Sequence, residues 1–228
     1  MPNLVPLYGK DKKIFSTTDG SFSFFNLTFN EAYRAKSVGA YSESLYKFVL
    51  ASEIVEKLKN SNVRLLDICF GLGYNLAITL NEALKAKATN ILDITSLEID
   101  KEVVELVKNS LIFFPYKGYS LLKDLIISGS KDNFRLNIVY GDASKTVFNL
   151  KNNFDVIFFD PFSKSKNPEM WNINIYKRLH TLLADDGVAV TYACSKKIRR
   201  EFEEAGFQTY PTPNLPKDFQ PGTILRKG

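Results

Sequence analysis

Cysteine, histidine and tryptophan are scarce in this sequence of 228 residues, which contains two, one and one of them. Cys69 and Cys194 lie in apolar, strand-like stretches, with no Cys-x-x-Cys spacing and no histidine cluster nearby. This pattern argues against a zinc site or a disulfide framework and predicts two buried, reduced thiols. His180 falls in a predicted helix away from the other candidate groups, where we expect a structural role. We therefore expect no bound metal.

Long apolar runs and targeting signals are also absent. No stretch approaches the roughly 20 apolar residues that cross a bilayer, and the first six residues lack the basic segment and apolar core of a secretory signal. The sequence thus predicts a cytoplasmic protein without membrane contacts. The hydrophobic share of 45% and aromatic share of 13% indicate one packed core rather than disorder. The formal net charge of +5 is compatible with RNA as a partner but does not establish it.

Two regions of different pattern meet near residue 60. Within Lys13–Phe25, two β-prone runs flank Asp19-Gly20, a dipeptide that favours the tight turn of a hairpin. Between Ala40 and Leu58, apolar residues recur at helical intervals. We predict an N-terminal extension at residues 1–60, made of a small β-hairpin and a helix, and a Rossmann-like domain at residues 61–228.

From Val63 onward, strand-like runs alternate with helix-like runs, which is typical of an α/β fold with a parallel sheet covered on both faces. The longer segment Phe114–Phe134 is expected to form a helix with irregular flanks. The predicted strands are Val63–Cys69, Ile91–Glu98, Leu136–Tyr140, Phe154–Phe159 and Val188–Ala193, with terminal antiparallel strands at Phe207–Tyr210 and Thr223–Arg226, and the predicted helices include Leu76–Lys87, Lys101–Ser110 and Ile173–Leu183.

The first predicted strand runs into Gly71-x-Gly73 and then into a helix. Glycine permits a positive φ and a close approach of a ligand to the backbone, and the helix N-terminus offers free N–H groups. A dinucleotide site would have a third glycine where Leu76 stands, so a pyrophosphate ligand is not favoured. Asp67 could instead face a cationic cofactor across the glycines. Taken alone, the two glycines fit a purely structural turn equally well.

Acidic residues end the next three predicted strands. Glu98 lies where a carboxylate accepts hydrogen bonds from ribose hydroxyls, whereas Asp100 better suits the cap of the helix that begins at Lys101. Asp142 could reach an adenine amino group or cap a helix, and Asp160 ends the fourth strand. Because open α/β folds bind ligands at the carboxyl edge of the sheet, four such strand ends predict a cofactor site there.

These residues resemble those of class I S-adenosylmethionine-dependent methyltransferases and, more narrowly, the MnmC methyltransferase family, which completes the 5-methylaminomethyl group on the wobble uridine of certain tRNAs. The stretch Phe158–Trp171 is similar to the family's Asp-x-Phe followed by Lys-Asn-Pro-Asp/Glu-Met-Trp. The family often adds a flavin-dependent oxidase domain, for which this chain has no room, so the resemblance implies a stand-alone methyltransferase. Weaker similarity extends over Thr18–Ser21, Ser37–Ser44, Cys194–Arg200 and Ala205–Phe207.

The resemblance implies S-adenosyl-L-methionine as the cofactor, tRNA as the partner, and methylation of the aminomethyl nitrogen of 5-aminomethyl-(2-thio)uridine. A separate enzyme would make this aminomethyl substrate. The amine arrives largely as an ammonium, since alkylamines have a pKa near that of lysine, about 10, so a carboxylate could accept its proton or orient it. Asp160 is the implied catalytic residue.

The resemblance also implies the binding residues. Cofactor contacts are implied for Glu43, Asp67, Phe70, Gly71, Gly73, Asn75, Glu98, Asp142, Ala143 and Asp160. Stacking on the target base is implied for Phe162 and Trp171, although a core role is the plainer interpretation of either aromatic. Contacts with RNA are implied for Lys164, Lys166, Arg199 and Arg200, although a solvated surface is the simpler alternative for each.

Three other functions fit parts of the sequence less well. Asp160-Pro-Phe162 also resembles the Asp/Asn-Pro-Pro-aromatic motif of methyltransferases that act on exocyclic base amines, but the second proline is absent. An aminopropyltransferase would have paired strand-end aspartates, which we do not find. A non-catalytic RNA-binding module would not need the set of Gly71, Gly73, Glu98 and Asp142.

Overall fold

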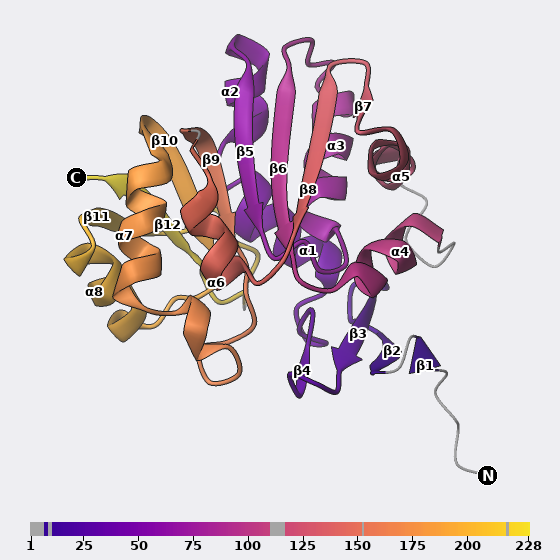
Figure 1. Cartoon of the computed structure of the whole chain (residues 1–228), viewed down its shortest axis with the longest axis horizontal. Coiled ribbons are helices and arrows are strands. Elements are labelled where there is room, and N and C mark those ends of the chain that lie inside the picture. The colour runs from indigo at the N-terminus through magenta and orange to yellow at the C-terminus, as the bar shows by residue number, and fades with distance from the viewer. Residues whose placement is uncertain (1–6, 9–10, 110–116, 152, 218) are drawn as a thin grey trace.

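The computed structural model of the chain describes residues 7–8, 11–109, 117–151, 153–217 and 219–228. These residues form a large central sheet with helices on both faces and a smaller antiparallel sheet at the carboxyl edge of the central strands (Figure 1). The Rossmann-like α/β fold predicted from the sequence is confirmed. Within the described residues, no helix combines the length and the apolar character needed to cross a bilayer.

The central sheet has eight strands in the order β11-β12-β10-β9-β5-β6-β8-β7. The chain moves outward from β5 through β6 to β8 and then returns to β9 on the other side of β5. This reversal is a topological switch point, where open α/β sheets bind ligands. Five strands are parallel, namely β5 (Val63–Ile68), β6 (Leu92–Glu98), β8 (Phe134–Tyr140), β9 (Phe154–Phe159) and β10 (Leu183–Thr191), while β7 (Ser130–Lys131), β11 (Phe207–Pro211) and β12 (Thr223–Lys227) are antiparallel.

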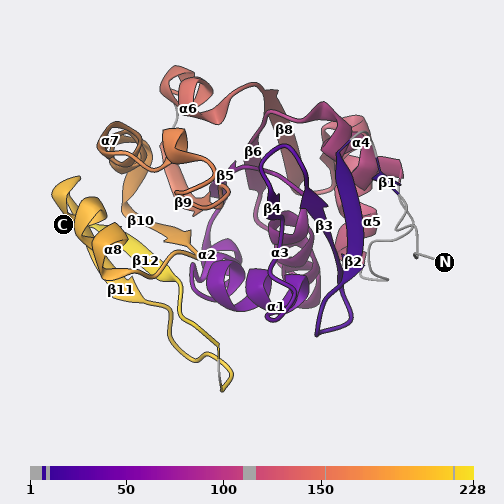
Figure 2. The same ribbon diagram turned by 90° about the horizontal axis from the view of Figure 1, so that it is seen from below.

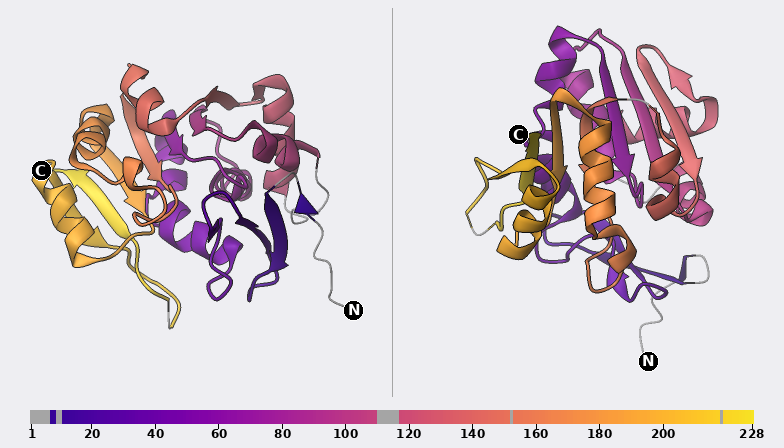
Figure 3. Two further views of the ribbon diagram at one scale, coloured as in Figure 1. Left: turned by 60° about the horizontal axis from the view of Figure 1, so that its bottom comes forward. Right: turned by 60° about the vertical axis from the view of Figure 1, so that its left-hand side comes forward.

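Helices cover both faces of this sheet (Figure 3). A hydrophobic cluster lies on each face. Successive side chains of a strand point to opposite faces, so in β9 Val156 and Phe158 join one cluster and Ile157 and Phe159 join the other. The first cluster packs α3 (Tyr74–Lys85), α4 (Lys101–Asn109) and α5 (Lys117–Ser128), and the second packs α6 (Ala143–Thr146), α7 (Ile173–Leu182), α8 (Lys196–Glu204) and the 3-10 turns Val147–Asn149 and Pro168–Met170.

The N-terminal sheet contains the predicted hairpin and two further short strands. Its order is β1 (Leu7–Tyr8), β2 (Lys12–Ser16), β3 (Phe22–Asn26) and β4 (Glu31–Ala32), all antiparallel. Seen from the carboxyl edge of the central strands, this small sheet lies across the loops that follow β5 and β6 (Figure 2). The Tyr74 hydroxyl of α3 donates to the Phe22 carbonyl at 2.6 Å. The extension therefore contacts the larger fold at the edge where its ligands are expected.

The helix predicted between Ala40 and Leu58 is not continuous, which corrects the sequence-based prediction. It divides into α1 (Ala40–Ser44), a π-helical turn (Leu45–Val49) and α2 (Ile54–Asn60). Glu53, with φ of 56°, separates the last two. Apolar spacing cannot reveal such a break, because the buried residues on either side still recur at roughly helical intervals.

Three smaller predictions need comment. Cys69 and Cys194 carry free thiols, but both are half-buried rather than buried as predicted. His180 packs edge-on against Phe207, with ring centroids 5.0 Å apart, in keeping with a structural role. Of the predicted elements, Ser110 and residues 114–116 lie outside the described residues.

Candidate active site

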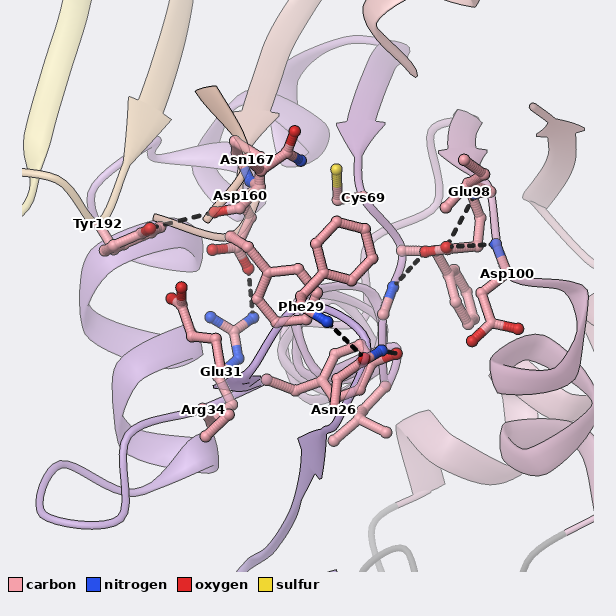
Figure 4. Close-up of a pocket in the computed structure, with 18 of the residues that line it drawn as sticks. Asn26, Phe29, Glu31, Arg34, Cys69, Glu98, Asp100, Asp160, Asn167 and Tyr192 are labelled. Carbon is pink, nitrogen blue, oxygen red and sulfur yellow. Dashed lines mark hydrogen bonds and ion pairs between the residues drawn. The ribbon is translucent and has the colours of Figure 1, made fainter. Parts of the chain in front are cut away.

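A cavity of about 360 Å³ lies at the switch point, between the carboxyl ends of β5 and β9 and the N-terminal sheet (Figure 4). Its volume falls within the range of small-molecule sites, roughly 300–1,000 Å³. A second cavity of about 190 Å³ shares part of this wall and continues toward Asp142 and Ala143. The residues that line the first cavity include Asn26, Phe29, Glu31, Tyr33, Arg34, Glu43, Cys69, Phe70, Gly71, Leu72, Glu98, Ile99, Asp100, Asp160, Pro161, Phe162, Asn167 and Tyr192.

Gly71, in the glycine turn predicted from the sequence, forms part of this wall, whereas Gly73 is absent from the described walls of both cavities. Gly71 and Gly73 have φ of 53° and 70°, in the left-handed region that favours glycine. A Cβ atom on Gly71 would lie 3.2 Å from the Tyr33 ring of the N-terminal sheet. The turn therefore needs glycine at residue 71 for its conformation and for the close approach of the small sheet.

Glu98 is held rigidly at the junction of the two cavities. One carboxylate oxygen accepts the Gly71 N–H at 2.8 Å, and the other accepts the N–H groups of Ile99 and Asp100, both at 2.8 Å. Burial raises the pKa of Glu98 although these hydrogen bonds oppose the shift. Asp100 caps α4 as predicted, since it accepts the Glu102 N–H at 2.8 Å, and it also pairs with Lys12 of β2 at 2.6 Å.

Asp142 caps a helix, which is one of the two alternatives that the sequence left open. Its carboxylate accepts the Ser144 N–H at 3.0 Å as the cap of α6, and hydrogen bonds from Ser144 lower its pKa. It also lines the second cavity together with Ala143. A polar group that enters this cavity can therefore meet the Asp142 side chain.

Asp160 belongs to a buried network of charges. Its Oδ2 atom pairs with the Arg34 guanidinium at 2.6 Å and accepts a hydrogen bond from the Asn75 amide at 2.8 Å. Arg34 also donates to the Asn75 carbonyl oxygen at 2.8 Å and lies 3.6 Å from Glu43, which in turn pairs with Lys47 at 3.0 Å. Asn75 and Glu43, predicted as cofactor contacts, thus support Asp160 and Arg34 in this structure.

The other oxygen of Asp160 remains available. Within the described part of the chain, no donor contacts Oδ1. Burial raises the pKa of Asp160 to about 6, while the charge of Arg34 and the hydrogen bond from Asn75 act in the opposite direction. Near neutral pH the carboxylate is therefore mostly ionised, and Oδ1 can accept a hydrogen bond or a proton from a group in the cavity.

Aromatic rings form one wall beside Asp160. Phe162 stacks on Phe29 with centroids 4.8 Å apart and lies 5.2 Å from the Tyr33 ring. The proposed stacking role of Trp171 is wrong in this structure, because Trp171 is only 2% exposed and packs edge-on against Phe159. Its indole N–H donates to the Phe162 carbonyl at 2.7 Å. Trp171 therefore positions the loop that carries Phe162 instead of meeting a base.

Asp67 is also not where the sequence-based hypothesis placed it. The side chain is 1% exposed and is absent from the described walls of both cavities. Its Oδ2 accepts the Ser96 hydroxyl at 2.7 Å, and its Oδ1 has no partner within the described residues. Burial raises the pKa of Asp67 to about 7. Asp67 thus lies beneath the turn and does not face a ligand across the glycines.

The four predicted RNA-contacting cations are absent from the walls of both cavities. Lys164 pairs with Glu201 at 2.6 Å, and Arg199 donates to Thr223 and Gly222, which ties α8 to β12. Lys166 and Arg200 are exposed. No group of three or more His, Cys, Asp or Glu side chains suited to hold a metal occurs among the residues that the structure describes.

The N-terminal sheet contributes residues to the site that were not predicted from the sequence. Asn26, Phe29, Glu31, Tyr33 and Arg34 all line the cavity. The sequence does place two aromatic and two charged residues close together, in a segment too short and irregular to predict a helix or strand. These residues are Phe29, Tyr33, Glu31 and Arg34. This placement gave no indication that these side chains reach the ends of β5 and β9.

Comparison with known proteins shows the family of the chain that carries this site. Residues 101–218, more than half of the chain, match the family described as S-adenosyl-L-methionine-dependent methyltransferases. The chain belongs to this family. Its cofactor is therefore S-adenosyl-L-methionine, and the family membership argues against a non-catalytic RNA-binding module.

Individual relatives narrow the similarity to MnmC-like methyltransferase domains. The solved structure of MnmC2 from Aquifex aeolicus is 30% identical, with a TM-score of 0.84 over 96% of this chain and 71% of that one. The tRNA 5-methylaminomethyl-2-thiouridine biosynthesis bifunctional protein MnmC of Campylobacter hominis is 32% identical over 84% of this chain and 29% of that protein. An uncharacterized protein of Methanocaldococcus jannaschii is 29% identical over 85% of this chain and 54% of that protein. The chain spans about half of one curated relative and less than a third of the other.

Proposed function

We propose that this methyltransferase methylates the aminomethyl nitrogen of 5-aminomethyl-(2-thio)uridine at the wobble position of tRNA, in the cytoplasm. The observation that carries the proposal is the Asp160 carboxylate, buried at the cavity wall with one oxygen uncommitted and with Phe162 beside it. The similarity to MnmC proteins, whose names describe tRNA 5-methylaminomethyl-2-thiouridine biosynthesis, supports the choice of substrate. A separate enzyme would make the aminomethyl group.

The residues at the two cavities fit the cofactor. Glu98 can accept hydrogen bonds from ribose hydroxyls, Asp142 and Ala143 border a second cavity suited to adenine, and Phe70 and Gly71 supply the wall between β5 and α3. When bound, S-adenosyl-L-methionine supplies a methyl group on a positively charged sulfur, which the lone pair of the substrate nitrogen attacks. The protein's own task is to bind the amine, remove its proton and hold it in line.

Proton removal is assigned to Asp160. An ammonium with a pKa near 10 must lose a proton before its lone pair is free, and Oδ1 can accept it. Burial raises the pKa of Asp160 from its usual value near 3.8 to about 6. This shift narrows the gap to the amine by about two units, which corresponds to about 3 kcal/mol. Arg34 and Asn75 hold Oδ2 and so fix the orientation of Oδ1.

We also propose that residues 1–60 are an extension of the domain at residues 61–228. Phe24, Ala40 and Phe48 share one hydrophobic cluster with the central sheet, and Arg34 completes the network around Asp160. Exposed Lys166 remains a proposed contact of the RNA backbone.

The test is methyl transfer from labelled S-adenosyl-L-methionine to tRNA that carries 5-aminomethyluridine. Wild type and Asp160→Asn are compared with Asp185→Asn, whose carboxylate is 99% exposed, as the matched control. We expect label in the wobble nucleoside, a loss of at least about a hundredfold for Asp160→Asn, and an unchanged rate for the control. Cofactor binding without transfer to this nucleoside would overturn the proposal, and label in another base amine would favour a different acceptor.

A further inference from the structure

The wall of the larger cavity is strongly acidic, although the whole protein has a formal net charge of +5. Among the described residues, five acidic side chains and one cation, Arg34, line it; the acidic ones are Glu31, Glu43, Glu98, Asp100 and Asp160. Two lysines lie directly behind the wall and offset part of this charge: Lys47 pairs with Glu43, and Lys12 pairs with Asp100. The cavity nevertheless retains an excess of negative charge.

Glu31 is the carboxylate of this wall that lacks a cationic partner at the Asp160 end. It accepts hydrogen bonds from the Ser163 N–H at 3.1 Å and the Ser163 hydroxyl at 2.6 Å, and no lysine or arginine among the described residues pairs with it. Figure 4 shows Glu31 at the end of the cavity where Asp160, Arg34 and Tyr192 gather, with Glu98 and Asp100 at the opposite end. The charges of Asp160, Glu31 and Glu43 add to burial in raising the pKa of Tyr192, in keeping with this grouping.

Glu31 and Asp160 differ in their partners, which indicates different roles for the two carboxylates. Arg34 and Asn75 occupy one oxygen of Asp160, and that carboxylate must change its protonation during the reaction. Glu31 is oriented by neutral donors alone, so its charge is free to act on whatever occupies the cavity. A partly enclosed carboxylate attracts a cation much more strongly than it would in water, and it repels an anion.

We propose that Glu31 determines the specificity for the methyl acceptor, by binding a cationic ammonium substituent beside Asp160 and excluding neutral or anionic substituents of similar shape. This inference rests on the proposed function, because it concerns the acceptor of the same cavity. Glu31 attracts the ammonium group, whereas Asp160 takes its proton. The methylated product keeps a basic nitrogen, so selection acts on the charge of the group and not on its methylation.

The test measures binding of three uridines that differ in charge at the 5-substituent: aminomethyl, hydroxymethyl and carboxymethyl. Titrations followed by NMR in the presence of S-adenosylhomocysteine compare the wild type with Glu31→Gln, with Ser163→Ala and with the exposed control Glu204→Gln. We expect the wild type to prefer aminomethyluridine over the alcohol by at least about tenfold, because a hydrogen bond between two charged groups is stronger than one to a neutral hydroxyl. Glu31→Gln should lose this preference through weaker amine binding, with the alcohol little changed.

Ser163→Ala separates charge from loop support, because it removes one hydrogen bond to Glu31 and keeps the carboxylate. It should preserve the preference for the amine. The inference is overturned if the wild type fails to distinguish amine from alcohol, if Glu31→Gln weakens both ligands equally, or if Ser163→Ala reproduces its effect. A wild type that prefers the amine but transfers no methyl to tRNA would contradict the proposed function and leave the role of Glu31 standing.

Discussion

Removal of the Arg34 guanidinium should destabilise the protein, and more so at high pH than at low pH. Arg34→Met keeps much of the side-chain volume but takes away the counter-ion that lies 2.6 Å from the buried Asp160 carboxylate. Breaking a buried ion pair by removing one partner costs about 3–5 kcal/mol, because an uncompensated charge remains. Glu43 keeps Lys47 at 3.0 Å, so the penalty falls mainly on Asp160.

The pH dependence follows from the pKa of Asp160. Burial raises this pKa to about 6, Arg34 acts to lower it, and the variant should therefore raise it further. A carboxyl whose folded-state pKa exceeds its unfolded value, near 3.8, stabilises the fold fully below that unfolded value, and the contribution is lost as pH rises through the folded pKa. At pH 5 Asp160 is protonated in the variant, so the penalty should fall to roughly half of its value at pH 8.

A double-mutant cycle tests whether Asp160 is the residue whose charge Arg34 neutralises. Asp160→Asn in the Arg34→Met background removes the stranded charge, so the double variant should recover at least about 2 kcal/mol of the single variant's loss. Urea denaturation at both pH values can be followed by the fluorescence of Trp171, the sole tryptophan, which is buried against Phe159. Penalties below about 1 kcal/mol at pH 8, equal penalties at the two pH values, or additive effects would refute the assignment of Arg34 as counter-ion.

Three further variants probe the turn, the charge beneath it and the loop beside it. Gly71→Ala should cost about 1–2 kcal/mol of stability and weaken cofactor binding by at least about tenfold, since φ is 53° and the new Cβ meets the Tyr33 ring at 3.2 Å. Gly129→Ala, with φ of 75° and its nearest neighbouring atom at 3.8 Å, should lose stability without a change in cofactor binding. Thermal unfolding and cofactor titration compare the two, and equal binding would count against the role of the turn. Asp67→Asn should gain stability relative to the wild type as pH rises from 4 to 7, by at most about 4 kcal/mol, because burial raises the pKa of Asp67 to about 7 from near 3.8; urea denaturation across this range would show a constant difference if the reasoning fails. Trp171→Phe removes the hydrogen bond to the Phe162 carbonyl and should cost about 1–3 kcal/mol and slow methyl transfer, which unfolding and transfer assays would contradict if both stayed unchanged.

The central sheet was predictable because buried parallel strands have nearly continuous apolar sequences. The bounds of β9, Phe154–Phe159, agree with the prediction. β10 begins at Leu183, five residues before the predicted start, since Leu183 already pairs with Phe154 of β9, and the register of the two strands then shifts between Leu183 and Val188. The intervening Ala184-Asp-Asp-Gly187 has the composition of a turn, so composition alone placed it outside the strand.

The site residues that the central sheet provides were predictable from the sequence. Gly71, Glu98 and Asp160 follow strands whose order along the chain already indicates a shared edge. Glu31 and Arg34 were not predictable in this way, because their contacts depend on how a separate small sheet docks. Glu31 and Ser163, which are 132 residues apart in the sequence, are in direct contact. No local periodicity or turn signal encodes a contact of that range.

The docking of the small sheet determines which substitution of Asp160 gives an interpretable experiment. The sequence presents Asp160 as a lone carboxylate, for which Asp160→Ala is the natural test. In the structure Oδ2 contacts Arg34 and Asn75 and so contributes to the stability of the fold, whereas Oδ1 is available to a group in the cavity. Alanine would strand the buried Arg34 and remove both functions together, so a loss of activity would not distinguish catalysis from misfolding. Asparagine keeps an oxygen that can accept from Arg34 and replaces the other oxygen by an amide NH2 group, which cannot accept a proton. Its loss of methyl transfer can therefore be attributed to the missing proton acceptor.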